Sequence, residues 1–147
     1  RQMCIRDSPC GLLSDHDLGD LAALPADLRA VMKPITKYSD NTGGGNNTAS
    51  YVTSTTDYLP LLSEFEYHGT RTYANSAEQN FQQQYAYYQA GNSKVHYKHN
   101  ATGTAAYAWC RSVYAADPAV FCRVYTDGDA ASSGAYSSWA VAPGFAA

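Results

Sequence analysis

The chain has 147 residues, of which 45% are hydrophobic and 16% are charged, and ten Lys and Arg against thirteen Asp and Glu give a net charge of −3. This balance fits one folded domain and argues against a disordered chain. No run approaches the roughly eighteen apolar residues of a membrane span, and no Lys/Arg cluster marks a nucleic-acid surface. We therefore expect neither membrane insertion nor nucleic-acid binding. The chain has thirteen Tyr but only four Phe, an excess that favours contact surfaces, because Tyr combines a large ring with a polar group.

The first nine residues, RQMCIRDSP, follow neither a helix nor a strand period. They look like translated sequencing-adapter sequence, and a disordered tail is the alternative. We treat residues 10–147 as a single domain and expect it to be the C-terminal part of a longer protein.

The first half of the chain predicts short helices and brief extended runs. A helix is expected from Pro25 to Met32, because Pro suits the first turn, and Pro34 ends it. Ile35 to Tyr38 is a short β-branched run, Asp40 to Ser50 is a loop of turn-forming residues, and Tyr58 to Leu62 predicts a buried strand.

Two helix starts follow in the sequence. Ser63-x-x-Glu66 is a capping-box pattern, which predicts a short helix directly after it. The range Ala77 to Ala90 predicts a longer helix with an apolar stripe at helical spacing, and Gly91 lies where a left-handed cap belongs.

The second half of the chain predicts short antiparallel strands. They cover Lys94 to Lys98, Tyr107 to Val113 and Val120 to Thr126, and Asp127-Gly128 supplies a tight turn. The final run Trp139 to Phe145 is limited to an edge by its proline. The fold class is therefore α+β, with short helices followed by a small, mostly antiparallel sheet with long loops.

The residues that could perform chemistry are scattered. The histidines at 16, 68, 96 and 99 have no Ser or Cys in a nucleophile pattern beside them. His96-x-x-His99 near Cys110 could suggest zinc, but on a strand-like run the two imidazoles point to opposite faces. Asp127-Gly128-Asp129 fits a hairpin turn better than a calcium loop. We expect no enzymatic activity, no metal and no cofactor.

Cys110 and Cys122 fall on neighbouring predicted strands. A disulfide between the strands is one alternative. Two buried free thiols that behave as small hydrophobic side chains are favoured, because the chain has so few cysteines.

The segment from Val113 to Trp139 is rich in Tyr, Ser, Ala, Gly and Asp. Antibody binding loops use the same residue types, because Tyr provides contact area at low entropy cost and Ser and Gly adapt locally. Ordinary surface turns of a small sheet explain the composition equally well.

Three motifs add a resemblance: Trp109-Cys110-Arg111-Ser112, then Phe121-Cys122-Arg123-Val124 with Thr126-Asp127-Gly128, and Ala142-Pro143-Gly144-Phe145. Together they resemble the WLRSP…FxxVxxDG…APGF signature of an uncharacterised domain of gut bacteria and their phages. That domain is C-type-lectin-like, similar to retroelement-diversified variable proteins and distantly similar to formylglycine-generating enzymes. The chain departs from the signature at Cys110, Val113 and Ala140.

The resemblance implies which residues are scaffold and which contact a ligand. The implied scaffold residues are Trp109, Arg111, Phe121, Gly128, Pro143, Gly144 and Phe145. The implied ligand-binding residues lie between them and are Tyr114, Asp117, Tyr125, Asp129, Tyr136, Ser137 and Trp139. None of the calcium-binding triplets of sugar-binding C-type lectins (EPN, QPD or WND) occurs in the chain.

The function that this resemblance implies is non-enzymatic ligand binding by a bacterial surface or phage tail protein. The expected partner is a protein or glycan on a host or neighbouring cell, and a cell surface or virion is the favoured location. Any oligomer is expected to form through a preceding N-terminal region. A structural assembly module is the first alternative, and a degenerate formylglycine-type oxidase is the second.

Overall fold

The computed structural model describes residues 24–42, 47–98 and 101–147. Its helices are α2 (Ala26–Val31), η1 (Ala49–Tyr51), α3 (Glu64–His68), η2 (Ser76–Asn80) and α4 (Ala86–Gln89), and η denotes a 3-10 helix. Its strands are β1 (Ile35–Asp40), β2 (Val52–Asp57), β3 (His96–Lys98), β4 (Ala101–Ala106), β5 (Ala108–Val113), β6 (Val120–Val124) and β7 (Ala130–Gly134). The α+β class is confirmed. None of the helices in the described ranges combines the length and hydropathy that crossing a bilayer requires.

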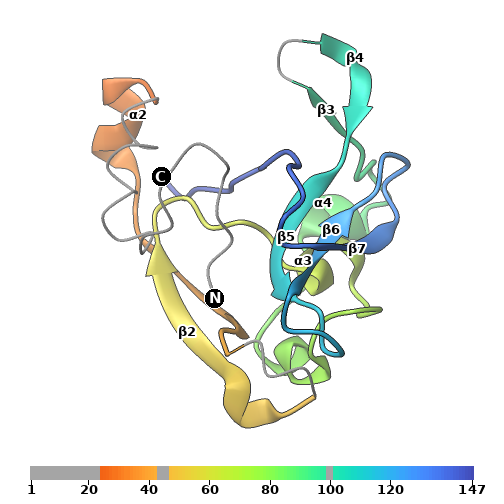
Figure 1. The fold of residues 1–147 in the computed structure, drawn as a ribbon. Coiled ribbons are helices and arrows are strands. Elements are labelled where there is room, and N and C mark those ends of the chain that lie inside the picture. Colours follow the sequence, from red (N-terminus) through yellow and green to blue (C-terminus); the bar gives the residue numbers. More distant parts are fainter. Residues whose placement is uncertain (1–23, 43–46, 99–100) are drawn as a thin grey trace.

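The strands form three small antiparallel sheets, which pair β1 with β2, β3 with β4, and β5 with β6 and β7. Figure 1 shows the β5–β6–β7 sheet together with α3 and α4 on the right, and the β3–β4 hairpin projecting above them. The C-terminus returns to α2, where Lys33 N–H donates to Ala146 O at 2.9 Å. The segment after α2 and the C-terminal residues, which are far apart in the sequence, are therefore hydrogen-bonded to each other.

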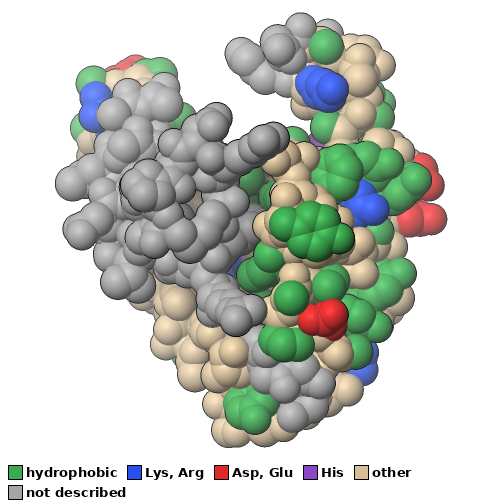
Figure 2. Space-filling model, viewed as in Figure 1, with side chains coloured by type: hydrophobic (Ala, Val, Ile, Leu, Met, Phe, Trp, Pro, Cys, Tyr) green, Lys and Arg blue, Asp and Glu red, His purple; other side chains and the backbone are tan. Residues whose placement is uncertain are grey.

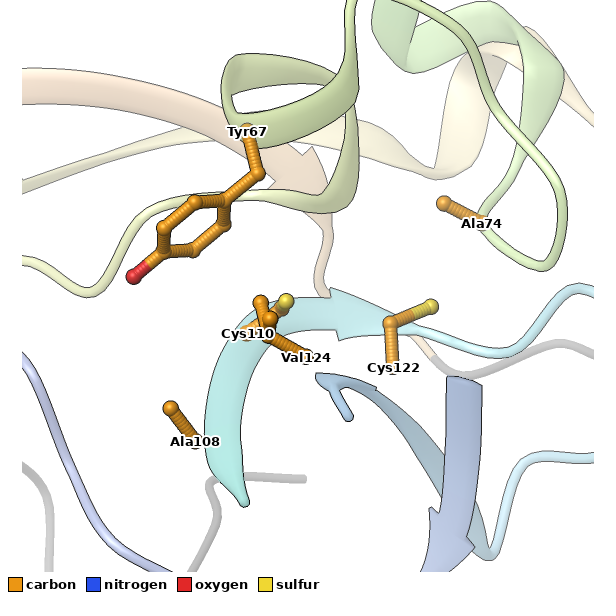
Figure 3. Close-up of a cluster of buried hydrophobic side chains, with 6 residues drawn as sticks. All are labelled: Tyr67, Ala74, Ala108, Cys110, Cys122 and Val124. Carbon is orange, nitrogen blue, oxygen red and sulfur yellow. The ribbon is translucent and has the colours of Figure 1, made fainter. Parts of the chain in front are cut away.

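The β5–β6 pair is buried on both faces. On the face toward α3, Tyr67 packs over Cys110, Cys122 and Val124 (Figure 3). On the opposite face, Trp109 and Phe121 meet edge to face with their ring centroids 6.2 Å apart. Side chains alternate between the faces of a strand, so consecutive residues of β5 supply two separate cores.

The predicted capping box is confirmed at α3. Ser63 Oγ accepts a hydrogen bond from Glu66 N–H at 3.0 Å, and the Glu66 carboxylate accepts one from Ser63 N–H at 2.9 Å. The helix ends at Gly69, whose φ of 70° is the left-handed conformation that glycine adopts at low cost. The helix near Pro25 and the strand from Val120 are also confirmed, and the β-branched run from Ile35 forms strand β1.

The predicted helix from Ala77 to Ala90 is wrong. The chain forms η2 and α4, and residues 81–85 between them are not helical. In that gap, Tyr85 N–H donates to Glu66 O at 3.1 Å and the Gln82 amide donates to Tyr38 O at 2.7 Å. The Tyr85 N–H thus bonds a carbonyl of α3 instead of a helical one, and the Gln82 side chain bonds β1, because tertiary context overrides local propensity.

The predicted strand from Tyr58 to Leu62 is also wrong. This segment makes only isolated contacts, such as Gly144 N–H donating to Pro60 O and Arg111 N–H donating to Leu62 O. Pro60 itself has no N–H for a regular ladder. The sequence does not predict β2. The order of the elements also differs from the expected one, in which helices come first and the sheet last, because the β1–β2 hairpin precedes α3.

Cys110 and Cys122 are both buried free thiols, as favoured. Burial raises the pKa of each thiol well above its usual value. Both sulfurs are therefore protonated at neutral pH and contribute as small apolar groups.

Candidate functional site

The seven predicted ligand-binding residues lie at two ends of the β5–β6–β7 sheet. Tyr114, Asp117, Tyr136 and Ser137 follow the ends where Val113 pairs with Phe121 and Val120 pairs with Gly134. Tyr125, Asp129 and Trp139 lie at the opposite end. A strand of five residues spans four steps of about 3.4 Å, or about 14 Å between the ends. The structure therefore brings these residues together as two groups.

The group at the Tyr125 end surrounds a cation that the sequence did not single out. The Arg123 guanidinium carbon lies 4.2 Å from the centre of the Tyr107 ring, 5.3 Å from Tyr125 and 5.0 Å from Trp139. Its Nε–H donates to Ser132 O at 3.2 Å, but within the described part of the chain neither its Nη1 nor Trp139 Nε1 has a hydrogen-bond partner. For Arg123, attraction between the guanidinium and the three ring faces compensates for the missing hydrogen bond. Asp129 is exposed at the adjoining turn.

That turn agrees with the predicted Asp127-Gly128 hairpin. Gly128 N–H donates to Tyr125 O at 3.0 Å, and Tyr125 N–H donates to Asp129 O at 2.8 Å. Gly128 has φ of 95°, which accounts for glycine there. Asp127 Oδ1 accepts from Asp129 N–H at 3.0 Å, so this carboxylate has a local backbone partner.

The group at the other end is more open. Tyr136 is 94% exposed, whereas Tyr114 packs edge to face on Tyr73 with centroids 5.6 Å apart. Asp117 accepts from Ala119 N–H at 2.8 Å, and Ser137 bonds the Ser133 hydroxyl at 3.2 Å. Figure 2 shows hydrophobic side chains at many places on the visible right-hand face, with acidic and basic side chains among them. Tyr136 is thus the ring at this end that has its surface free for a partner.

The implied scaffold residues divide in their burial. Trp109 and Phe121 are each 3% exposed and form the second core. Phe145, by contrast, is 51% exposed. Its neighbour Gly144 instead ties the C-terminal run to residue 60 by a backbone hydrogen bond.

A pocket of about 420 Å³ lies elsewhere, between β1 and the segment from Phe81 to Gln89. It contains none of the seven predicted residues. Its lining residues are Thr36, Lys37, Tyr38, Glu66, Phe81, Gln82, Gln83, Gln84, Tyr85, Ala86, Gln89 and Arg111. The volume lies within the range of small-molecule sites, about 300–1,000 Å³.

Three charges lie in one wall of this pocket. Lys37 Nζ lies 2.8 Å from Glu66 Oε1, and Arg111 Nη1 pairs with Glu66 Oε2. Burial alone raises the pKa of the Glu66 carboxyl, but the bonds and charge of Arg111, with those of Lys37 and Ser63 N–H, leave that pKa below its usual value. Glu66 therefore stays ionised at neutral pH while it caps α3.

Arg111 has a structural share in this wall. Its Nε–H donates to Ser39 Oγ at 2.7 Å and its Nη1 donates to Leu61 O at 2.8 Å. These bonds connect β5 to β1 and to the extended segment before α3, which agrees with the scaffold role that the resemblance implies. The sequence does contain a signal for this cluster. Lys37 in PITKYS and Arg111 in YAWCRSVY are each the one charged residue of a short uncharged run, where a charge needs a partner if the run is buried.

Metal ligands do not gather in the described part of the chain, where no group of three or more His, Cys, Asp or Glu could hold an ion. His99 of the His96-x-x-His99 pair lies outside the described residues, as does His16. His68 and His96 both pack against the Tyr67 ring, and neither Nε2 has a hydrogen-bond partner in residues 24–42, 47–98 and 101–147. Burial lowers the pKa of both imidazoles, to about 4 for His68.

Comparison with known proteins places these features in a family. The model of a domain of unknown function (DUF6273) matches residues 21–146. The chain belongs to this family. No curated protein and no solved structure matches the chain. The DUF6273 match spans both the pocket and the two groups at the ends of the sheet, so all three lie within the family domain.

Proposed function

We propose that this DUF6273 chain is a non-enzymatic ligand-binding domain of a bacterial surface or phage tail protein. It recognises a protein or glycan through the Tyr/Ser-rich surface formed by the two groups at the ends of the β5–β6–β7 sheet. A C-type-lectin-like fold, similar to that of retroelement-diversified variable proteins, belongs to the same proposal and rests on the three motifs. The observation that carries it is the 94% exposure of Tyr136 at the end of the sheet whose β5–β6 pair is buried on both faces.

The chemistry of the two groups supports a binding role. Exposed Tyr rings supply contact area at low entropy cost and anchor many interfaces. Tyr125 is 38% exposed while Arg123 and Tyr107 support its ring from behind. Asp117 and Asp129 are exposed at turns and can fix the orientation of a partner.

The separation of the groups limits the kind of ligand. A partner that contacts both ends of the sheet spans about 14 Å. A single sugar or amino acid is shorter than that. The arrangement therefore favours a protein surface or an extended glycan chain.

The test is adhesion of the parent particle or cell after the combined change Tyr114→Ala, Tyr125→Ala and Tyr136→Ala. We expect adhesion to fall by at least about tenfold, because aromatic anchors carry most of the energy of an interface. Tyr87→Ala with Tyr97→Ala is the matched control, since both rings are more than half exposed on other elements. Adhesion that is equal in the two variants contradicts the proposal.

An assembly module is the second candidate, and the edge of the sheet favours it. In the described ranges no strand pairs with the outer side of β7, and its sequence AASSG has no charge or proline to discourage pairing with another chain. Size-exclusion chromatography at several concentrations separates the candidates. Self-association supports assembly, whereas a monomer at all concentrations supports the binding domain.

A further inference from the structure

We propose that the pocket between β1 and the segment from Phe81 to Gln89 binds a small ligand that carries one carboxylate and one ring. A hexuronic acid is the simplest sugar of this kind. The site is separate from the Tyr/Ser-rich surface, and it would act independently of the proposed adhesion.

The charge of the wall points to a monoanion. Lys37 and Arg111 supply two positive charges, and Glu66 supplies one negative charge, so the wall has one positive charge in excess. The side chains of Lys37 and Arg111 are only 13% and 12% exposed. Poor solvation strengthens their attraction for an anion. A dianion would leave one negative charge unmatched beside Glu66, which disfavours phosphate.

Three hydrogen-bond donors remain for this anion. Lys37 Nζ has three N–H donors and uses two, toward Glu66 and toward the Tyr85 hydroxyl at 2.7 Å. Tyr85 accepts that bond, so its own O–H is free to donate. Arg111 Nη2 makes one long contact, at 3.4 Å to Tyr38 O, and its second N–H has no partner among the residues that the structure describes. Charged donors to a carboxylate form the stronger class of hydrogen bond.

An apolar wall adjoins the donors. The Tyr38 and Phe81 rings stack with centroids 5.0 Å apart and an interplanar angle of 15°. They are nevertheless 37% and 52% exposed. Such rings offer flat faces to the C–H groups of a saccharide ring, and the exposed amides of Gln83 and Gln89 can bond its hydroxyls.

A purely structural role is the alternative explanation for these donors. The contacts of Lys37 and Tyr85 argue against it. Arg111 ties backbone segments together, whereas in the described ranges Lys37 Nζ bonds only the Glu66 and Tyr85 side chains. Within the same ranges the Tyr85 hydroxyl has only Lys37 as its hydrogen-bond partner. These two groups can be changed without disturbing the Arg111 connections.

The experiment is isothermal titration of the protein with glucuronic acid, glucose and acetate. We expect saturable binding of glucuronic acid and at least about tenfold weaker binding of glucose, which lacks the carboxylate, and of acetate, which lacks the ring. Lys37→Met should weaken glucuronic acid binding about tenfold or more. Tyr85→Phe, which keeps the ring and removes the O–H, should weaken it by about fivefold.

Lys98→Met is the matched control, because this lysine is exposed on β3, outside the pocket. The Lys98→Met variant should bind glucuronic acid with the same affinity as the unchanged protein. Near-UV circular dichroism verifies that each variant is folded, and Tyr85→Phe keeps the test informative if Lys37→Met unfolds. Equal affinity for glucuronic acid and glucose, absence of saturation, or unaltered binding by a folded Tyr85→Phe overturns the proposal. Unchanged binding in the triple Tyr variant would support the independence of the pocket.

Discussion

The two faces of the β5–β6 pair are stabilised in different ways. One face is filled by Trp109, Val113 and Phe121, with Leu61 and Trp139 packed against them. Hydrogen bonds organise much of the other face, which looks toward α3. There the Ser112 hydroxyl accepts from Glu64 N–H at 3.3 Å and donates to the Glu78 carboxylate at 2.7 Å. Apolar packing stabilises the first face, and hydrogen bonds add to the packing of Tyr67 on the second.

Two buried carboxylates accept hydrogen bonds from backbone N–H groups on the side of α3. Glu64 is 1% exposed, and its carboxylate accepts from Tyr73 N–H at 3.0 Å and from Ala74 N–H at 2.8 Å. Glu78, also 1% exposed, accepts from Asp40 N–H at 2.8 Å. Backbone N–H groups of irregular segments need partners when they are buried. Glutamate side chains supply these partners where neighbouring strands do not.

The largest effect should follow from breaking the apolar face. Trp109→Ala removes a ring that is 3% exposed and should lower the free energy of unfolding by about 3–5 kcal/mol, through lost burial and the cavity left behind. Urea unfolding followed by circular dichroism measures this. Tyr136→Ala is the control and should change stability by no more than about 0.5 kcal/mol. Equal effects of the two changes would mean that this face is not a core.

A smaller loss should follow from removing one of the hydrogen bonds on the face toward α3 without changing the volume of the side chain. Glu64→Gln keeps the volume but turns an NH₂ group toward backbone N–H donors. We expect the free energy of unfolding to fall by about 2 kcal/mol, since hydrogen bonds to charged groups are lost and a donor is left unpaired. Asp117→Asn, at an exposed turn, should have almost no effect. If Glu64→Gln leaves the free energy of unfolding unchanged, the backbone N–H groups of residues 73 and 74 need only an acceptor oxygen and not a negative charge.

The smallest effect concerns pH and the histidines beside Tyr67. His68 is half-buried, and this burial together with nearby Lys94 lowers its pKa from the usual 6.5 to about 4, while Asp129 acts in the opposite direction. The folded state then binds fewer protons than the unfolded state, so this contribution to stability is complete above pH 6.5 and is lost as pH falls toward 4. His96 shifts in the same direction, and the raised pKa of Glu78 acts oppositely.

Comparing the pH dependence of the melting temperature in the unchanged protein and in His68→Leu isolates the contribution of His68. The melting temperature of the unchanged protein should fall more between pH 7.5 and pH 5 than that of His68→Leu, by a few degrees, because partial exposure of the imidazole weakens the effect. Contributions of Glu78 and His96 are common to both proteins and cancel. Parallel pH profiles would show that His68 binds a proton equally well folded and unfolded.

The sequence by itself determined the features that depend on residues a few positions apart. The Ser63–Glu66 capping box, the helix after Pro25 and the turn at Asp127-Gly128 all lie where the sequence predicts them. Each is a set of local hydrogen bonds or a fixed backbone angle, so neighbouring residues suffice to specify it.

The tertiary structure alone decided the break in the predicted helix from Ala77 to Ala90, the pocket and the aromatic rings around Arg123. The break follows from bonds that residues 82 and 85 make to residues 38 and 66. The pocket joins residues from Thr36 to Arg111, and the rings on Arg123 come from positions 107, 125 and 139. Such contacts join residues that no local spacing brings together, because their energies depend on the positions of whole elements rather than on the residues beside them.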